Sequence, residues 1–130
     1  MPKIMIADDS MFARLLLKEA VSQIYDNAEY IEAKSGQEVL DKFAEGLQVD
    51  WYLLDVNMGE PNGLETAETL IEQGVDVNQI ALVTGNKSSE LQSKADDIDL
   101  NYINKALSPT DVEPFVERLR LFFSAKSGEL

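Results

Sequence analysis

Residues 3–10, which read KIMIADDS, set the pattern of the fold. The apolar run over residues 3–7 predicts a buried strand, and it ends in two adjacent acids and a serine. Serine at this point favours the start of a helix. The same order of apolar run, polar turn and helix-like segment recurs to the end of the chain. Further strands are predicted over residues 29–33, 51–54, 80–83 and 101–104.

Helix-like segments follow each predicted strand. The first runs over residues 10–25, with an apolar stripe formed by Leu15, Leu16, Ala20, Val21 and Ile24. The others are predicted from the capping box of residues 35–38 to Gly46, from Asn62 to about Gln73, from Ser88 to about Ala95, and after Ser108. The acids at positions 96, 97 and 99 are expected to end the fourth helix, because acids oppose the helix dipole there. The last helix carries Val112, Phe115, Val116, Leu119, Phe122 and Phe123 at helical spacing.

Five strands alternating with five helices predict an α/β fold, with a parallel sheet covered by helices on both faces. In such sheets, ligands bind beyond the carboxyl ends of the strands, where the strand order reverses. The residues that follow each strand are therefore the first candidates for a functional site.

Composition narrows the possible functions. The chain has 130 residues, which suits one domain, and 45% are hydrophobic, enough for a core. It has no cysteine and no histidine, so disulfides, thiolate metal sites, histidine bases and histidine-bound zinc are excluded. A net charge of −13 disfavours binding to nucleic acid or anionic membranes. The start does not resemble a signal peptide and no apolar run is long enough to span a membrane, so a cytoplasmic location is expected.

Reactive side chains follow four of the predicted strands. Asp8 and Asp9 follow the first, Asp55 the third, Thr84 and Gly85 the fourth, and Lys105 the fifth. Each alone has a plainer explanation, such as a helix cap, a turn or a solvated charge. Together they predict three carboxylates, a hydroxyl and an ammonium at one edge of the sheet.

Three carboxylates that lie so near one another need a cation in order to remain ionised. Oxygen ligands alone favour a hard ion, and Mg²⁺ with retained waters fits best. Asp55 could then act as a nucleophile towards phosphorus. Lys105 and the Thr84 hydroxyl are suited to neutralising the oxygens of a transferred phosphoryl group.

These motifs resemble those of the CheY-like receiver domain of two-component response regulators, and the resemblance covers essentially the whole chain. It rests on Asp8-Asp9-Ser10, Asp55 within residues 53–58 (LLDVNM), Gly63, Thr84-Gly85, and Lys105 with Tyr102 before it. Residues 33–38 (AKSGQE) are also similar to the family pattern. The resemblance implies a flavodoxin-like fold with strand order 2-1-3-4-5.

The resemblance also implies the role of each site residue. Asp55 would accept a phosphoryl group from the phosphohistidine of a histidine kinase. Asp9, Asp55 and the backbone carbonyl of Asn57 would bind Mg²⁺, with Asp8 acting through water. Thr84 and Tyr102 would form the switch pair. Gly85 and Asn86 would line the pocket, and Asn57 and Asn86 occupy positions that tune dephosphorylation.

The implied partners are a sensor histidine kinase or phosphotransfer protein, and a downstream protein that binds the fourth helix, fifth strand and fifth helix. Residues 1–130 are expected to form a stand-alone receiver without an output domain, because the last helix runs almost to Leu130. The chain would signal by protein binding or a phosphorelay, as in chemotaxis, and would catalyse only its own phosphorylation and dephosphorylation. No binding to nucleic acid or membrane is expected.

Two segments depart from the family pattern. Ala106 follows Lys105 where the family usually has proline, often with a cis peptide bond. Met58-Gly59 stands where the family usually has Met-Pro, and Pro61 comes two positions later. The loops after the third and fifth strands are therefore expected to differ from the usual geometry.

Three other functions were considered. A receiver-like binding module that is never phosphorylated would not need the complete set of site residues. A dehalogenase-like phosphatase would place its two acids two positions apart rather than adjacent, and would need a cap domain. A flavin-binding flavodoxin-like protein would need a phosphate loop where Asp8 and Asp9 would repel phosphate.

Overall fold

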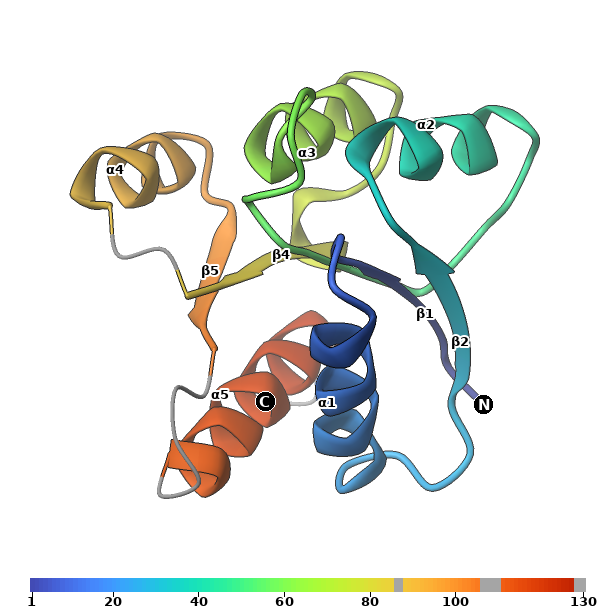
Figure 1. The fold of residues 1–130 in the computed structure, drawn as a ribbon, viewed down its shortest axis with the longest axis vertical. Coiled ribbons are helices and arrows are strands. Elements are labelled where there is room, and N and C mark those ends of the chain that lie inside the picture. Colours follow the sequence, from blue (N-terminus) through green and yellow to red (C-terminus); the bar gives the residue numbers. More distant parts are fainter. Residues whose placement is uncertain (86–87, 106–110, 128–130) are drawn as a thin grey trace.

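The computed structural model describes residues 1–85, 88–105 and 111–127, with side chains as far as residue 124. Five strands form one parallel sheet in the order β2-β1-β3-β4-β5, which confirms the predicted flavodoxin-like topology (Figure 1). The strands are β1 (Lys3–Ala7), β2 (Glu29–Ala33), β3 (Trp51–Leu54), β4 (Ile80–Thr84) and β5 (Asn101–Asn104). The strand order reverses between β1 and β3, so the point favoured for a ligand lies beyond the carboxyl ends of these two strands.

Helices cover both faces of the sheet, as Figure 1 shows. The helices α1 (Met11–Ser22) and α5 (Val112–Ser127) lie on one face. On the other lie α2 (Gly36–Ala44), α3 (Gly63–Glu72) and α4 (Ser89–Asp97). A short 3₁₀ turn at Val77–Gln79, which the sequence patterns did not predict, precedes β4.

The inner strands β1, β3 and β4 are apolar on both sides because both faces of the sheet are covered. Met5, Tyr52, Leu54 and Leu82 point to the core under α2, α3 and α4. Alternate residues of the same strands, such as Ile6 and Leu53, point to the core under α1 and α5. Hydrophobic burial on both faces thus holds β1 and β3 at the centre of the sheet, and their carboxyl ends are fixed with them.

Polar side chains cap the starts of four helices. The side chains of Ser10, Ser35, Asn62 and Ser88 each accept a hydrogen bond from a backbone N–H in the first turn. Of the capping box predicted over residues 35–38, the structure shows the bond from the Glu38 N–H to the Ser35 side chain at 3.1 Å. A reciprocal capping box is formed by Asn62 and Glu65, which the sequence analysis had not identified. Each cap contributes about 1 kcal/mol to helix stability.

The predicted apolar stripe of α1 was partly wrong. Leu15 and Leu16 are each 48% exposed, whereas Arg14 and Leu17 are buried. The run of three leucines at positions 15–17 allows more than one helical phase, and packing against β1 and α5 selected the phase that buries Leu17. Ala20 and Val21 are buried as predicted, and Ile24 packs beside them beyond the helix end at Ser22.

The fourth helix also differs from its predicted form. It continues to Asp97, so Asp96 and Asp97 lie inside it rather than after it. Ala95 is fully buried and Leu100 nearly so, and the burial of these residues outweighs the roughly 0.3–1 kcal/mol that acids cost at a helix C-terminus. Asp99 then adopts a positive φ of 58°, which turns the chain into β5.

The last helix buries Phe115, Val116, Leu119, Phe122 and Phe123 as predicted, although Val112 at its start is 38% exposed. Its predicted cap at Ser108 lies outside the described residues. Within the described part of the chain, every helix is too short or too polar to cross a bilayer.

Candidate functional site

Three carboxylates meet where β1 and β3 end. One oxygen from each of Asp8, Asp9 and Asp55 lies within 4.8 Å of the others. The backbone places them there, because the Asp55 N–H donates to the Ala7 carbonyl at 2.9 Å and the Asp8 N–H donates to the Ala33 carbonyl at 3.1 Å. Asp8 and Asp55 are buried, whereas Asp9 is exposed. The predicted convergence of the acids is therefore confirmed.

Lys105 joins this cluster from the end of β5. Its Nζ lies 2.6 Å from Asp8 Oδ2 and 3.5 Å from Asp55 Oδ1. Its backbone N–H donates to the Thr84 carbonyl at 3.1 Å, so Lys105 itself is anchored to β4. One ammonium thus partly neutralises two buried carboxylates, and a charged group is already in place to meet an anion bound at Asp55.

Thr84 occupies the carboxyl end of β4 and is fully buried. Its hydroxyl lies within hydrogen-bonding reach of the Asp55 carboxylate, to which it donates. The Thr84 hydroxyl and the Lys105 ammonium, the two predicted neighbours, therefore both lie beside the Asp55 carboxylate.

Burial raises the pKa of Asp55 above its usual range. The Asp8 carboxylate raises the pKa further, while the charge of Lys105 and the hydrogen bonds from Thr84 and Lys105 lower it without reversing the shift. Keeping Asp55 ionised therefore costs free energy in the folded protein. A divalent cation beside it would relieve that cost.

The raised pKa of Asp55 predicts a pH-dependent effect on stability. The folded protein holds this proton more tightly than the unfolded chain, so the stability contributed by protonated Asp55 is full below the unfolded pKa of about 3.9 and is lost as pH rises through the folded pKa. Without a divalent ion, Asp55→Asn should raise the melting temperature at neutral pH, and the gain should shrink as pH falls towards 4. Thermal melts followed by circular dichroism between pH 4 and 8 would check this. A substituted protein that melts lower than the wild type at neutral pH would contradict it.

The donor set fits Mg²⁺. Carboxylate oxygens from three residues converge, and exposed Asp9 leaves the cluster open to water, which Mg²⁺ retains when it binds proteins. The cluster contains no soft ligand that would favour zinc or copper, since the chain has neither cysteine nor histidine. The acidic cluster could therefore hold a hard divalent ion.

The other predicted site residues are placed as follows. Asn57 is exposed in the loop after β3, and Gly85 is exposed directly after Thr84. Tyr102 is half-buried on β5 and packs against the core under α2, α3 and α4, where burial raises its pKa.

Two of the predicted positions, Asn86 and Ala106, lie outside the described residues, and with Ala106 the peptide bond that joins it to Lys105. The loop after β3 contains a cis peptide bond between Glu60 and Pro61.

Gly63, named above only as part of the motif, is required by its contact with Asp55. A Cβ at this position would overlap the backbone carbonyl of Asp55, and the Gly63 N–H donates to the Val56 carbonyl at 3.0 Å. The start of α3 therefore packs directly against the backbone that carries the central carboxylate.

Substituting Gly63→Ala should destabilise the protein by roughly 1–3 kcal/mol, because neither backbone can yield without distortion. It should also slow any reaction at Asp55, whose backbone must shift. Gly74→Ala, at a positive φ of 103° beyond the far end of α3, is the matched control. It should cost stability and leave reaction at Asp55 unchanged. Chemical denaturation would measure the first effect, and an unchanged midpoint for Gly63→Ala would contradict the packing argument.

Arg14 was not among the predicted site residues. Its guanidinium is buried and donates to the backbone carbonyl of Asp8 at 2.7 Å. A usable signal was present, since Arg14 lies three positions before Leu17 and seven before Val21, on the buried face of α1.

The fold and the site together define a class: a flavodoxin-like sheet with an acidic, lysine-bearing site at its carboxyl edge. A family model described as the response regulator receiver domain matches residues 4–117. The chain belongs to the response regulator receiver domain family. Receiver domains are signalling modules that act with histidine kinases or phosphotransfer proteins, and they typically use Mg²⁺.

Known proteins of the same kind are similar over much of the chain. The nitrate/nitrite response regulator protein NarL of Escherichia coli K12 is 28% identical over 98% of this chain, which spans 56% of NarL. The chemotaxis protein CheY of Thermotoga maritima is 30% identical over 62% of this chain and 64% of its own length. Among solved structures, the Mn²⁺-bound form of the response regulator Rcp1 superposes with a TM-score of 0.80 at 16% identity, covering 95% of this chain and 94% of Rcp1. This last likeness supports the fold.

Proposed function

We propose that this protein is a phosphorylation switch whose receiver domain accepts a phosphoryl group on Asp55. The donor is the phosphohistidine of a sensor histidine kinase or phosphotransfer protein. The phosphorus–nitrogen bond of the donor breaks, a phosphorus–oxygen bond to Asp55 forms, and the departing imidazole nitrogen takes a proton from solvent. Atoms and charge balance without any further reactant.

One observation carries the proposal: Asp55 lies beside two other carboxylates and beside the Lys105 ammonium, at 3.5 Å. Phosphoryl transfer requires positioning and neutralisation of charge rather than elaborate covalent chemistry. Lys105 can pair with one phosphoryl oxygen and the Thr84 hydroxyl can donate to another. The proposed nucleophile thus sits among the groups that the transition state needs.

Mg²⁺ would be held by Asp9, Asp55 and the backbone carbonyl of Asn57, with Asp8 acting through water. When bound, it would supply positive charge to the phosphoryl oxygens. The geometry of Asp8 agrees with an indirect role, because its Oδ2 is already paired with Lys105 at 2.6 Å. The Mn²⁺-bound form of Rcp1 supports divalent metal binding on the same fold.

The signal would pass through Thr84 and Tyr102 to the surface formed by α4, β5 and α5, where a downstream protein binds. Thr84 donates to Asp55 and pairs in the sheet with Asn104, two residues beyond Tyr102. A new phosphoryl group would compete for the Thr84 hydroxyl, and β5 is the adjacent strand. Chemotaxis signalling and a phosphorelay, both in the cytoplasm, are the proposed contexts. With a charge of −13, the chain is proposed to bind neither nucleic acid nor membrane.

Incubation with acetyl phosphate and Mg²⁺ tests the proposal. Intact mass spectrometry should show the gain of one phosphoryl group that hydroxylamine removes, as expected for an acyl phosphate. Chelation of Mg²⁺ with EDTA should abolish the gain. A protein that binds Mg²⁺ but gains no phosphoryl group would instead be a receiver-like binding module, and the proposed function would be wrong.

A further inference from the structure

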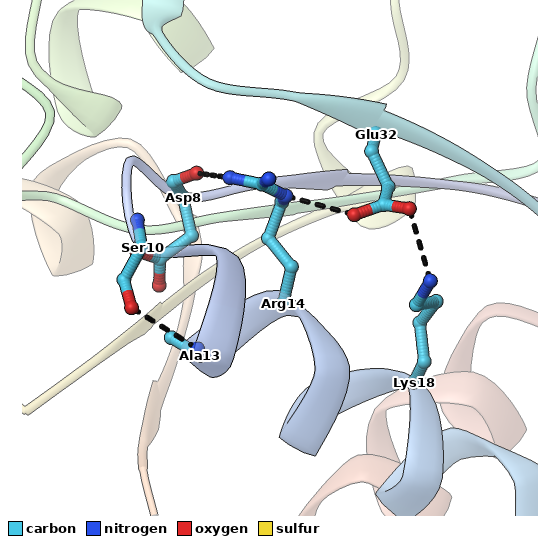
Figure 2. A network of polar contacts seen from close by, with 6 residues as sticks. All are labelled: Asp8, Ser10, Ala13, Arg14, Lys18 and Glu32. Carbon is cyan, nitrogen blue, oxygen red and sulfur yellow. Dashed lines mark hydrogen bonds and ion pairs between the residues drawn. The ribbon is translucent and has the colours of Figure 1, made fainter.

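An ion-pair network around the buried Arg14 links α1 to the acidic cluster (Figure 2). The Arg14 side chain is only 7% exposed, and its Nη1 donates to the Asp8 carbonyl at 2.7 Å. Its Nε donates to Glu32 Oε1 on β2 at 2.8 Å, and Lys18 Nζ pairs with Glu32 Oε2 at 2.9 Å. These two cations lower the pKa of Glu32, the hydrogen bond from Lys18 most strongly, so this carboxylate stays charged.

The contact from Arg14 completes the anchoring of Asp8. The Asp8 N–H donates to Ala33, Oδ1 accepts from the Ser10 N–H at 3.0 Å, and Oδ2 accepts from Lys105. Arg14 supplies the bond to the remaining polar atom, the backbone carbonyl. That carbonyl belongs to the peptide unit that joins Asp8 to Asp9, so the bond from Arg14 restrains the backbone from which the exposed Asp9 carboxylate projects.

Stability alone does not explain a buried arginine at this position. Desolvation of the buried guanidinium costs free energy, its partner Glu32 is 40% exposed, and an apolar side chain of similar volume commonly stabilises a core as well. Leu17 and Val21 occupy the same face of α1. What an apolar side chain could not do is bind the Asp8 carbonyl and Glu32 at once, which the planar guanidinium does.

We propose that Arg14 is a positioning residue for the metal site, which holds the Asp8–Asp9 peptide so that the Asp9 and Asp55 carboxylates face the same ion. The inference rests on the proposed metal-dependent function and names a residue that makes it work. Arg14 does not contact the ion; it acts through Asp8.

The sign of the effect separates positioning from simple electrostatics. Arg14 carries a positive charge near a cation site, so its charge alone opposes metal binding. Removing that charge with Arg14→Met would then tighten binding, if charge were all that mattered. Positioning predicts weaker metal binding instead for both Arg14→Met and Arg14→Lys. Methionine has no donor, and lysine keeps the charge but lacks the planar guanidinium that donates to two acceptors at once.

Mn²⁺ titration followed by electron paramagnetic resonance, which measures free ion, tests this on the whole chain. Dissociation constants for Arg14→Met and Arg14→Lys should rise about tenfold, in keeping with other residues that orient metal ligands. Arg120→Met removes a like charge from an exposed pair with Glu117 on α5 and should change binding less than twofold. Leu17→Ala, in the core on the same helix, should lower the melting temperature without weakening Mn²⁺ binding.

If Arg14→Met does not fold, Arg14→Lys is sufficient for the test. It keeps the positive charge and loses the guanidinium, and the same roughly tenfold rise in the dissociation constant is expected. Unchanged or tighter binding in the variants that fold would overturn the inference. A wild-type protein that binds no Mn²⁺ would instead overturn the proposed metal site, so the two failures are distinguishable.

Discussion

Asp55→Asn is expected to take up no phosphoryl group from acetyl phosphate, whatever the Mg²⁺ concentration. The amide of asparagine is no nucleophile towards phosphorus, and Asp55 is the carboxylate that touches Lys105 and Thr84 together. The substitution keeps the shape of the side chain, so the fold should remain. Intact mass spectrometry before and after hydroxylamine treatment measures the loss.

Asp50→Asn provides the matched control for this prediction. Asp50 lies just before β3, at the opposite end of the strand from Asp55, and accepts a hydrogen bond from the Lys3 N–H at 2.7 Å. It should be phosphorylated like the wild type. Equal labelling of Asp55→Asn would show that another residue accepts the phosphoryl group, and the assignment of Asp55 would be wrong.

Lys105→Met should slow phosphorylation of Asp55 by about 10²–10³-fold, the cost of losing one preorganised group that stabilises developing charge. The same substitution removes a cation that lies 2.6 Å from Asp8 and 3.5 Å from Asp55, so metal binding should not weaken. A slower phosphorylation rate with unchanged metal affinity is expected only of a residue that contacts the phosphoryl oxygens. A purely structural role of Lys105 would lower the rate and the metal affinity together.

The measurement is the rate of mass gain at saturating Mg²⁺, with Mn²⁺ affinity determined in parallel. Lys94→Met is the control, because Lys94 is exposed on α4 and pairs only loosely with Glu90 at 3.3 Å. Its phosphorylation rate should match that of the wild type. A Lys105→Met protein that is phosphorylated at the normal rate would contradict the role proposed for this lysine.

The sequence predicted the strands well because the inner strands β1, β3 and β4 are short apolar runs buried on both faces, and the more exposed edge strands β2 and β5 each have a short apolar centre. Lys3–Ala7, Glu29–Ala33, Trp51–Leu54 and Asn101–Asn104 match their predicted bounds, and β4 gains only Thr84. Helix faces were harder to predict, since three consecutive leucines in α1 fit several phases and only packing chose among them. The length of α4 depended on the burial of Ala95 and Leu100, which a local rule about helix-end acids does not include.

The site was predictable where residue type and strand end coincide. Asp8, Asp9, Asp55, Thr84 and Lys105 all follow or close a strand, and parallel topology brings such ends to one edge. Arg14 was missed because it reaches the site from a helix, through a backbone carbonyl rather than a side chain. Any residue type can supply a backbone carbonyl, so the partner of such a contact cannot be recognised from the sequence.

The most direct test of the central claim is anomalous X-ray diffraction from crystals grown with Mn²⁺. We expect one strong anomalous peak within coordination distance of carboxylate oxygens from both Asp9 and Asp55. A peak at some other group of acids, with these two carboxylates empty and turned away from each other, would contradict it.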